Sequence, residues 1–449
     1  MKAIQTRFLL LLLSAFPLGG LAADPSPEAI ARDFLARFVS KDAGIVGMMD
    51  AKMRAAFGAT EAAKTEDGLA AQGGKFMKLG DARTERKGDF AIVVIRGNYD
   101  KLSLDFRVTI DEAGMVAGFF VSDLRSLAQW GLPPYAKRGA WKDEEVIVGA
   151  AGWPLHGSLS IPEGKGPFPA VLLVQGSGPS DRDETIGPNK IFADMAAGLA
   201  TDGIAVLRYD KRSLVHADEM AELASTIGVR EETVDDALAA LAFLAQDRRI
   251  DSKRIFLLGH SLGAMLGPMI ASEARARDIP VAGLVLLAPN ESPLEDVIVR
   301  QVEYLSKPAL GGESLGAAEV SKLEAAALRV KALGAAPSPE DPAPSLLPLG
   351  IPASWWRSIA GYDPLRSARE LGLPLLVIHG SRDYQVGPVE AALWKKGLAD
   401  IKAAKVMLID GLNHLMIDGS GPSTPAEYEK PGHVDRRAIG EVAGFLLSH

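Results

Sequence analysis

Two segments of the chain repeat the pattern G-x-S-x-G, which in a suitable setting exposes a serine nucleophile. They are GHSLGA at 259–264 and GESLGA at 312–317, and their serines are Ser261 and Ser314. Ser261 lies between RIFLL, which predicts a strand, and GAMLGPMIA, which predicts a helix. A strand, a tight turn and a helix form the setting that this chemistry needs. Ser314 follows SKPALGGE, whose proline and glycines disfavour a strand. We therefore interpret Ser314 as a helix N-cap and Ser261 as the nucleophile.

A serine nucleophile needs a base and an acid, and both types of residue follow later strands. VIHGSRD ends on Asp383, and LIDGLNH ends on His414. In this order of serine, acid and histidine, His414 would accept the serine proton and Asp383 would orient the imidazole. Glu291, after VLLAPN, is an alternative acid. We interpret two further histidines, His260 and His379, as packing residues.

The oxyanion formed by such an attack requires backbone N–H donors. We expect one from Leu262, directly after the nucleophile, and the other from Ser177, with Gly176 as its neighbour in the loop VQGSGPSDRDE. The acidic residues at 181–184 of this loop could be taken for a metal site. Because Arg182 separates them, we favour a salt-bridged loop and expect neither a metal ion nor a cofactor.

The elements that must position these residues form two patterns. From residue 144 to residue 449, short apolar strands alternate with helices, which predicts an α/β domain with a mostly parallel central sheet. Ala-rich and Pro-rich sequence at about 290–370 interrupts the alternation and predicts a helical cap insertion. Residues 24–129 contain helices at 26–57 and then three strands, FAIVVIRG, LSLDFRVTI and MVAGFFVSD, which predict a small α+β domain. The stretch 130–143 is interpreted as a linker.

Composition limits the location and the partners of the chain. Residues 1–23 carry a basic start, an apolar run of nine residues and a small-residue end, which predicts a secretory signal cleaved after Ala23. The run is shorter than the about 20 residues of a membrane span, and we expect no span in the mature chain. The net charge of −8, with no basic cluster, argues against nucleic acid as a partner. The chain has no cysteine, which excludes disulfides and a thiol nucleophile.

Five segments together resemble secreted bacterial α/β-hydrolases of the dienelactone-hydrolase-like and serine-aminopeptidase-like groups. They are GSGPSDRDE, LRYDKRS, GHSLGA, HGSRD and NH, spread over residues 176–414. The resemblance covers residues from about 144 to 449 and implies a serine hydrolase that uses Ser261, Asp383 and His414. The N-terminal module resembles a domain of unknown function that precedes such hydrolases. The chain departs from this group at Gln175, where many relatives have histidine, at Ser213, and in GHSLGA, where GHSEGG is more usual.

These observations predict an exported hydrolase of the periplasm or the extracellular space, with a carboxylic ester as its small-molecule substrate. An aminopeptidase-like serine peptidase acting on short peptides is the first alternative, with acids such as Glu291 and Glu313 available to hold an amine. A binding or accessory protein without catalysis is the second. Neither the acyl group nor the leaving group follows from the sequence, because a fold alone does not determine a substrate.

Overall fold

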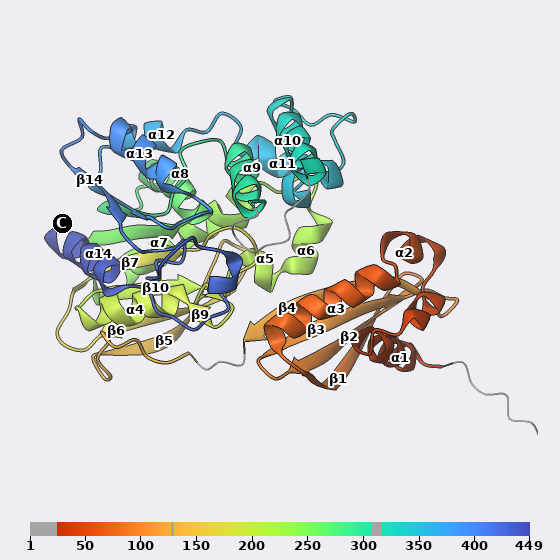
Figure 1. Cartoon of the computed structure of the whole chain (residues 1–449). Helices are drawn as coiled ribbons and strands as arrows, with labels where there is room; N and C mark the ends of the chain where they lie inside the picture. Colours follow the sequence, from red (N-terminus) through yellow and green to blue (C-terminus); the bar gives the residue numbers. More distant parts are fainter. Residues whose placement is uncertain (1–24, 127–129, 308–316) are drawn as a thin grey trace, which may run out of the picture. The chain divides into compact units, whose positions relative to one another are not determined.

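The computed structural model describes residues 25–126, 130–307 and 317–449 (Figure 1). The chain divides into two units, residues 1–127 and 128–449. The predicted signal segment, its cleavage point and the rival serine Ser314 lie outside the described residues. Among the residues described, no helix is both long enough and apolar enough to cross a membrane.

The smaller unit packs helices against an antiparallel sheet with the strand order β1-β2-β3-β4. Ser26 caps the first helix by accepting a hydrogen bond from the Ala29 N–H, and Phe34 and Phe38 of that helix are buried. Phe38 meets Phe106 of the sheet edge to face, with their ring centroids 5.7 Å apart. The elements are α1 (Pro27–Val39), η1 (Ala43–Met48), α2 (Ala51–Ala56), α3 (Ala59–Gly73), β1 (Phe76–Lys87), β2 (Phe90–Tyr99), β3 (Leu102–Ile110) and β4 (Val116–Ser126).

Two of these elements, α3 and β1, are absent from the sequence-based prediction, which placed a polar connecting stretch there. The β1 sequence FMKLGDARTERK has no regular alternation of apolar and polar residues, and its pairing with β2 has register shifts. A strand of this kind is stabilised by its hydrogen-bonded neighbour rather than by its own pattern. The small domain therefore has four strands instead of the predicted three.

The larger unit is built on an eight-stranded sheet with the order β14-β13-β12-β11-β7-β10-β6-β5. The six neighbouring strands from β14 to β10 in this order pair in parallel, while β6 pairs antiparallel with both β10 and β5. This confirms the predicted fold class. The strands are β5 (Trp141–Val148), β6 (Leu155–Pro162), β7 (Phe168–Val174), β10 (Ala205–Tyr209), β11 (Ile250–His260), β12 (Gly283–Leu287), β13 (Leu375–Gly380) and β14 (Ala404–Ile409), and a separate two-stranded pair is β8 (Thr185–Ile186) with β9 (Asn189–Lys190).

Helices cover both faces of this sheet, which explains why its central strands, such as β7 and β12, are apolar throughout rather than alternating. Along β7, Leu172 packs with residues of α7 and α8, whereas its neighbours Val171 and Leu173 pack with residues of α4 and α14. The helices outside the insertion are α4 (Ile191–Thr201), α5 (Arg212–Val215), α6 (Ala217–Glu222), η2 (Arg230–Val234), α7 (Asp235–Gln246), α8 (Leu262–Ala276), α13 (Pro388–Gly397), η6 (Pro425–Glu427) and α14 (Arg436–Ser448).

A helical insertion separates β12 from β13, in the region where the sequence predicts a cap (Figure 1). Two adjacent tryptophans, Trp355 and Trp356, are buried and join this insertion to the core around α7 and α8. The described elements of the insertion are α9 (Leu294–Leu305), α10 (Ala317–Lys331), η4 (Pro344–Leu346), η5 (Pro348–Gly350), α11 (Ala353–Ser358) and α12 (Pro364–Leu371).

The stretch 130–143 is not a free linker. The indole N–H of Trp130 donates to Asp194 Oδ1 at 2.8 Å, and the Lys137 N–H donates to Thr201 Oγ1 at 3.0 Å. Strand β5 begins at Trp141, inside the predicted linker. Because Asp194 and Thr201 both belong to α4, this stretch is part of the larger unit.

Replacing Gly263 with alanine should destabilise the larger unit. A Cβ at Gly263 would lie 2.3 Å from the Val174 carbonyl oxygen, which is backbone and has little freedom to move. We expect a loss of unfolding free energy near the upper end of the about 1–3 kcal/mol typical of overpacking. Gly440→Ala is the matched control, since Gly440 also lies in a helix and nothing surrounds its Cβ position. The control should be stabilised by up to about 1 kcal/mol.

Urea unfolding followed by tryptophan fluorescence measures this difference in the larger unit alone. All six tryptophans belong to that unit, at positions 130, 141, 153, 355, 356 and 394. Equal stability of the two variants would contradict the close contact between Gly263 and the Val174 carbonyl oxygen.

His379, which is fully buried in β13, should make the larger unit less stable in mild acid. Burial lowers its pKa from 6.5 to about 4. Between these values the unfolded chain binds a proton that the folded chain does not, so the unfolding free energy falls as the pH falls. The expected contribution is roughly 2 kcal/mol between pH 7 and pH 5.

The same fluorescence assay at the two pH values tests this contribution. His379→Gln should lose that part of the pH dependence, whereas His156→Gln, at an exposed histidine, should keep it. An unchanged pH dependence in His379→Gln would show that this histidine is not buried in its neutral form.

Candidate active site

Ser261 occupies a one-residue turn between β11 and α8. Its backbone has φ 52° and ψ −117°, a left-handed conformation that is strained for a residue other than glycine. The Ser261 N–H donates to the Leu287 carbonyl oxygen at 2.9 Å, and its own carbonyl oxygen accepts from the Met265 N–H at 2.9 Å. Both backbone bonds hold the residue in this conformation while its side chain stays half-buried rather than enclosed. This is the geometry of a nucleophile elbow.

Two glycines make this turn possible. A Cβ at Gly259 would lie 2.2 Å from the Gly263 carbonyl oxygen, and a Cβ at Gly263 would lie 2.5 Å from the Gln175 carbonyl oxygen. The helix therefore begins in contact with the end of β7, at the carboxyl edge of the sheet, where open α/β folds bind their ligands.

Asp383 and His414, which follow β13 and β14, form a hydrogen-bonded pair. Nδ1 of His414 lies 2.7 Å from Oδ2 of Asp383, and both side chains are almost fully buried. With the Nδ1 proton donated to the carboxylate, Nε2 carries the lone pair that a general base needs. The structure thus pairs His414 with Asp383 rather than with the alternative acid Glu291.

The Asp383 carboxylate is kept ionised although it is buried. Burial by itself would raise its pKa, but the charge of His414 and the hydrogen bond from it outweigh burial and lower the pKa. The other carboxylate oxygen, Oδ1, accepts N–H bonds from Gln385 at 2.8 Å and from Val386 at 2.9 Å. These bonds also fix the orientation of the carboxylate toward the histidine.

The loop after β7 passes directly beside the nucleophile. A Cβ on Gly176 would lie 3.2 Å from the Ser261 Cβ, so the next residue, Ser177, is close to the elbow. The Gly176 N–H is already used, because it donates to Oε1 of Glu184 at 2.7 Å. Leu262 is the first residue of α8, where a backbone N–H has no acceptor within the helix. The amides of Leu262 and Ser177 are thus the two oxyanion donors that we expect, and Gly176 is a neighbour only.

His260 has a more specific role than the packing that the sequence indicates. Its Nδ1 lies 3.0 Å from Oε1 of Glu184, and its Nε2 lies 3.0 Å from the His414 carbonyl oxygen. Both neighbours offer acceptor atoms, and a protonated ring could donate to both of them. Burial opposes that charge, but Glu184 outweighs burial and raises the pKa of His260. His260 therefore joins the elbow to the loop that carries His414.

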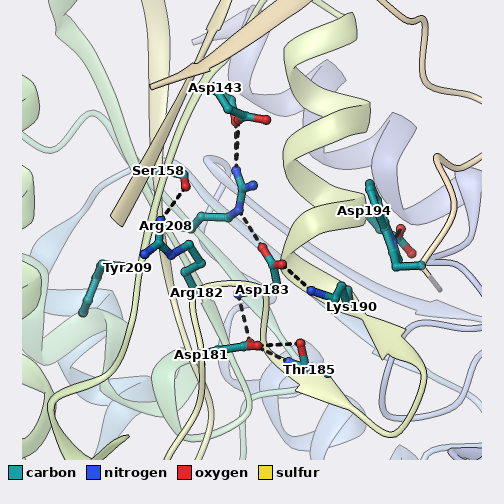
Figure 2. Close-up of polar contacts among 12 residues, drawn as sticks. Asp143, Ser158, Asp181, Arg182, Asp183, Thr185, Lys190, Asp194, Arg208 and Tyr209 are labelled. Atoms are coloured by element: carbon teal, nitrogen blue, oxygen red, sulfur yellow. Dashed lines mark hydrogen bonds and ion pairs between the residues drawn. The ribbon is translucent and has the colours of Figure 1, made fainter. Parts of the chain in front are cut away.

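Ion pairs fold the acidic loop 181–184 (Figure 2). Asp183 pairs with Lys190 at 2.8 Å and with Arg208 at 3.0 Å, and Arg182 pairs with Asp210 at 2.9 Å. These contacts agree with the salt-bridged interpretation of the loop. Glu184 follows Asp183 with φ 48° and contacts His260, the residue before Ser261.

The rival acid Glu291 lines a cavity of about 430 Å³ together with Met265 and Tyr362. Its backbone N–H donates to Glu390 at 2.7 Å. Burial and the nearby Glu390 raise the pKa of its carboxyl group.

Sequence reasoning missed Glu184 and Lys211 as site residues. Both occur in segments that carry the family resemblance, GSGPSDRDE and LRYDKRS, but no spacing rule indicates what they contact. Lys211 contacts Gly176, 35 positions before it, and Glu184 contacts His260, 76 positions after it, in addition to Gly176 in its own segment.

Comparisons with known proteins find similar families for both parts of the chain. Residues 171–429 match the family described as the alpha/beta hydrolase family, and residues 31–119 match a family described as a protein of unknown function (DUF3887). The chain is 39% identical over 379 residues to esterase EstD of Thermotoga maritima, which covers 84% of this chain and 85% of that protein.

Solved esterases show a more distant similarity. A Pyrococcus furiosus esterase is 16% identical with a TM-score of 0.42, covering 71% of this chain and 97% of its own. Est1E of Butyrivibrio proteoclasticus is 16% identical with a TM-score of 0.43, covering 68% and 99%. On the match of residues 171–429 and the similarity to EstD, the chain belongs to the alpha/beta hydrolase family.

Proposed function

We propose that the chain is an exported carboxylic-ester hydrolase that acts through Ser261, His414 and Asp383. The observation that carries the proposal is the 2.7 Å bond between His414 and Asp383, in a loop that His260, the residue before the strained Ser261 turn, contacts at 3.0 Å. The similarity to a protein named as an esterase supports an ester substrate. The signal-like sequence at 1–23 supports export, and residues 144–449 are proposed as the catalytic domain.

The proposed reaction assigns to these groups the roles of a serine, histidine and aspartate triad. Oγ of Ser261 attacks the acyl carbon while Nε2 of His414 takes the hydroxyl proton. The oxyanion accepts hydrogen bonds from the amides of Leu262 and Ser177. His414 then gives the proton to the leaving alkoxide, and water hydrolyses the acyl-enzyme by the same route. Asp383 stays ionised throughout and stabilises the imidazolium.

Labelling with a fluorophosphonate probe tests the nucleophile. The wild-type protein should be tagged on the peptide that contains Ser261, and Ser261→Ala should not be tagged. Ser314→Ala is the matched control, because both serines lie in the same short pattern. It should be tagged like the wild type, since Ser261 is unchanged. The same mass spectrometry also tests cleavage of the signal after Ala23, since the N-terminal peptide of the exported protein should then begin at Asp24. A tag that remains in Ser261→Ala would place the nucleophile elsewhere.

Replacing Asp383 with asparagine should lower kcat by about 10⁴, because an amide does not fix the same histidine tautomer. Glu291→Gln, at the alternative acid, should leave kcat within a few-fold of wild type. Hydrolysis of p-nitrophenyl butyrate measures both, with alanine p-nitroanilide as the peptidase-type substrate. A large loss in Glu291→Gln with little loss in Asp383→Asn would reverse the assignment of the acid. Faster turnover of the anilide would favour a peptidase.

A further inference from the structure

Buried charged side chains hold the backbone at Gly176 from two sides. Its N–H donates to Oε1 of Glu184 at 2.7 Å, and its carbonyl oxygen accepts from Nζ of Lys211 at 2.9 Å. Glu184 and Lys211 are 3% and 2% exposed. Hydrogen bonds to charged groups are shorter and stronger than those between neutral groups, so this stretch of backbone has little freedom to rotate.

Lys211 is placed for this contact by its own buried partner. It follows β10, and its Nζ lies 2.8 Å from Oε1 of Glu232 in η2. Oε2 of Glu232 accepts the indole N–H of Trp355, in the insertion, at 2.6 Å. Burial would raise the pKa of Glu232, but the charge of Lys211 and the hydrogen bonds from Lys211 and Trp355 lower it.

Net stability is a weak explanation for such a pair. Removing two charges from water costs several kcal/mol each, and well-packed apolar residues of similar volume are often as stabilising. An apolar pair would lose two bonds, the one from Trp355 to Glu232 and the one from Lys211 to the Gly176 carbonyl oxygen, and only the second is made by Lys211. The function of Lys211 therefore concerns that carbonyl group.

The carbonyl oxygen of Gly176 and the N–H of Ser177 belong to the same peptide unit. A peptide unit is planar, and this one is trans, so its N–H points away from its C=O. A group that fixes the oxygen also fixes the direction of the Ser177 N–H. A positive charge at the oxygen polarises the unit further and makes that N–H a stronger donor.

We propose that Lys211 is a positioning residue of the oxyanion hole, which orients and polarises the Gly176–Ser177 peptide from the side opposite the substrate. Glu184 holds the preceding N–H in the same way, and His260 joins Glu184 to the elbow and to the His414 loop. The inference rests on the proposed function, since it concerns the oxyanion of that reaction.

The test uses the double variant Lys211→Met/Glu232→Gln, which removes both charges and leaves neither group buried without its partner. We expect kcat for p-nitrophenyl butyrate to fall by about 10- to 100-fold, with KM changed by less than a few-fold. The loss should be smaller than the about 10²–10³-fold that follows removal of an oxyanion donor, because the Ser177 N–H is still present.

A trifluoromethyl ketone provides a second readout, because it forms a tetrahedral oxyanion with the serine. Its affinity should weaken by about the same factor as kcat. The affinity of a matched alcohol, which forms no oxyanion, should not change. If Lys211 had a purely structural role, the double variant would keep the wild-type ratio of ketone to alcohol affinity. Its kcat would also not fall selectively while KM stays the same.

The double variant Arg212→Met/Asp236→Asn is the matched control, because it removes a neighbouring and equally buried ion pair whose hydrogen bonds do not involve Gly176. Its kcat should stay within a few-fold of wild type even if tryptophan fluorescence shows a loss of stability. If Lys211→Met/Glu232→Gln does not fold, Lys211→Gln takes its place: a selective loss of ketone affinity supports the proposal, and a wild-type ratio of ketone to alcohol affinity overturns it. A folded Lys211→Met/Glu232→Gln variant with wild-type kcat and ketone affinity also overturns it. If the wild-type protein hydrolyses no ester and Ser261 takes no label, the proposed function itself fails.

Discussion

The crossing of α8 over the end of β7 is the constraint on which the site depends. The first turn of the helix lies so close to the strand that a Cβ on Gly263 would come within 2.3 Å of a β7 carbonyl oxygen. Because the helix begins there, the chain turns from β11 into α8 at one residue, and Ser261 takes a left-handed conformation. The same edge of the sheet carries the ends of β13 and β14, which bring Asp383 and His414 to each other.

Around this crossing, buried charges add directional hydrogen bonds to the apolar packing of the loops, such as that of Leu412 and Leu415. Glu184, His260 and Lys211 come from three separate segments, and all of them reach Gly176 or the His414 loop. Charged groups are costly to bury, but their hydrogen bonds are directional, whereas apolar packing is not. Loops held in this way keep backbone donors in place without help from the substrate, which is what stabilisation of an oxyanion requires.

Strands with a strong pattern of their own were predictable, and those without one were not. The apolar runs of β7, β11, β12 and β13 are buried on both faces, which is the origin of their composition. Strand β1 contains charged residues and a glycine, and it is a strand because β2 pairs with it. The hairpin strand β5 was recognised, but its start at Trp141 fell inside the predicted linker.

The sequence by itself determined the α/β fold class, the candidate Ser261 elbow and the chain order of Ser261, Asp383 and His414. Each of these depends on a local feature, either the periodicity of apolar residues or the turn that glycine permits. Only the tertiary structure chose Asp383 over Glu291 as the partner of His414, joined His260 to Glu184 and brought Lys211 to the Gly176 carbonyl. These contacts join residues from about 30 to more than 150 positions apart, and no local pattern encodes which buried donor meets which acceptor.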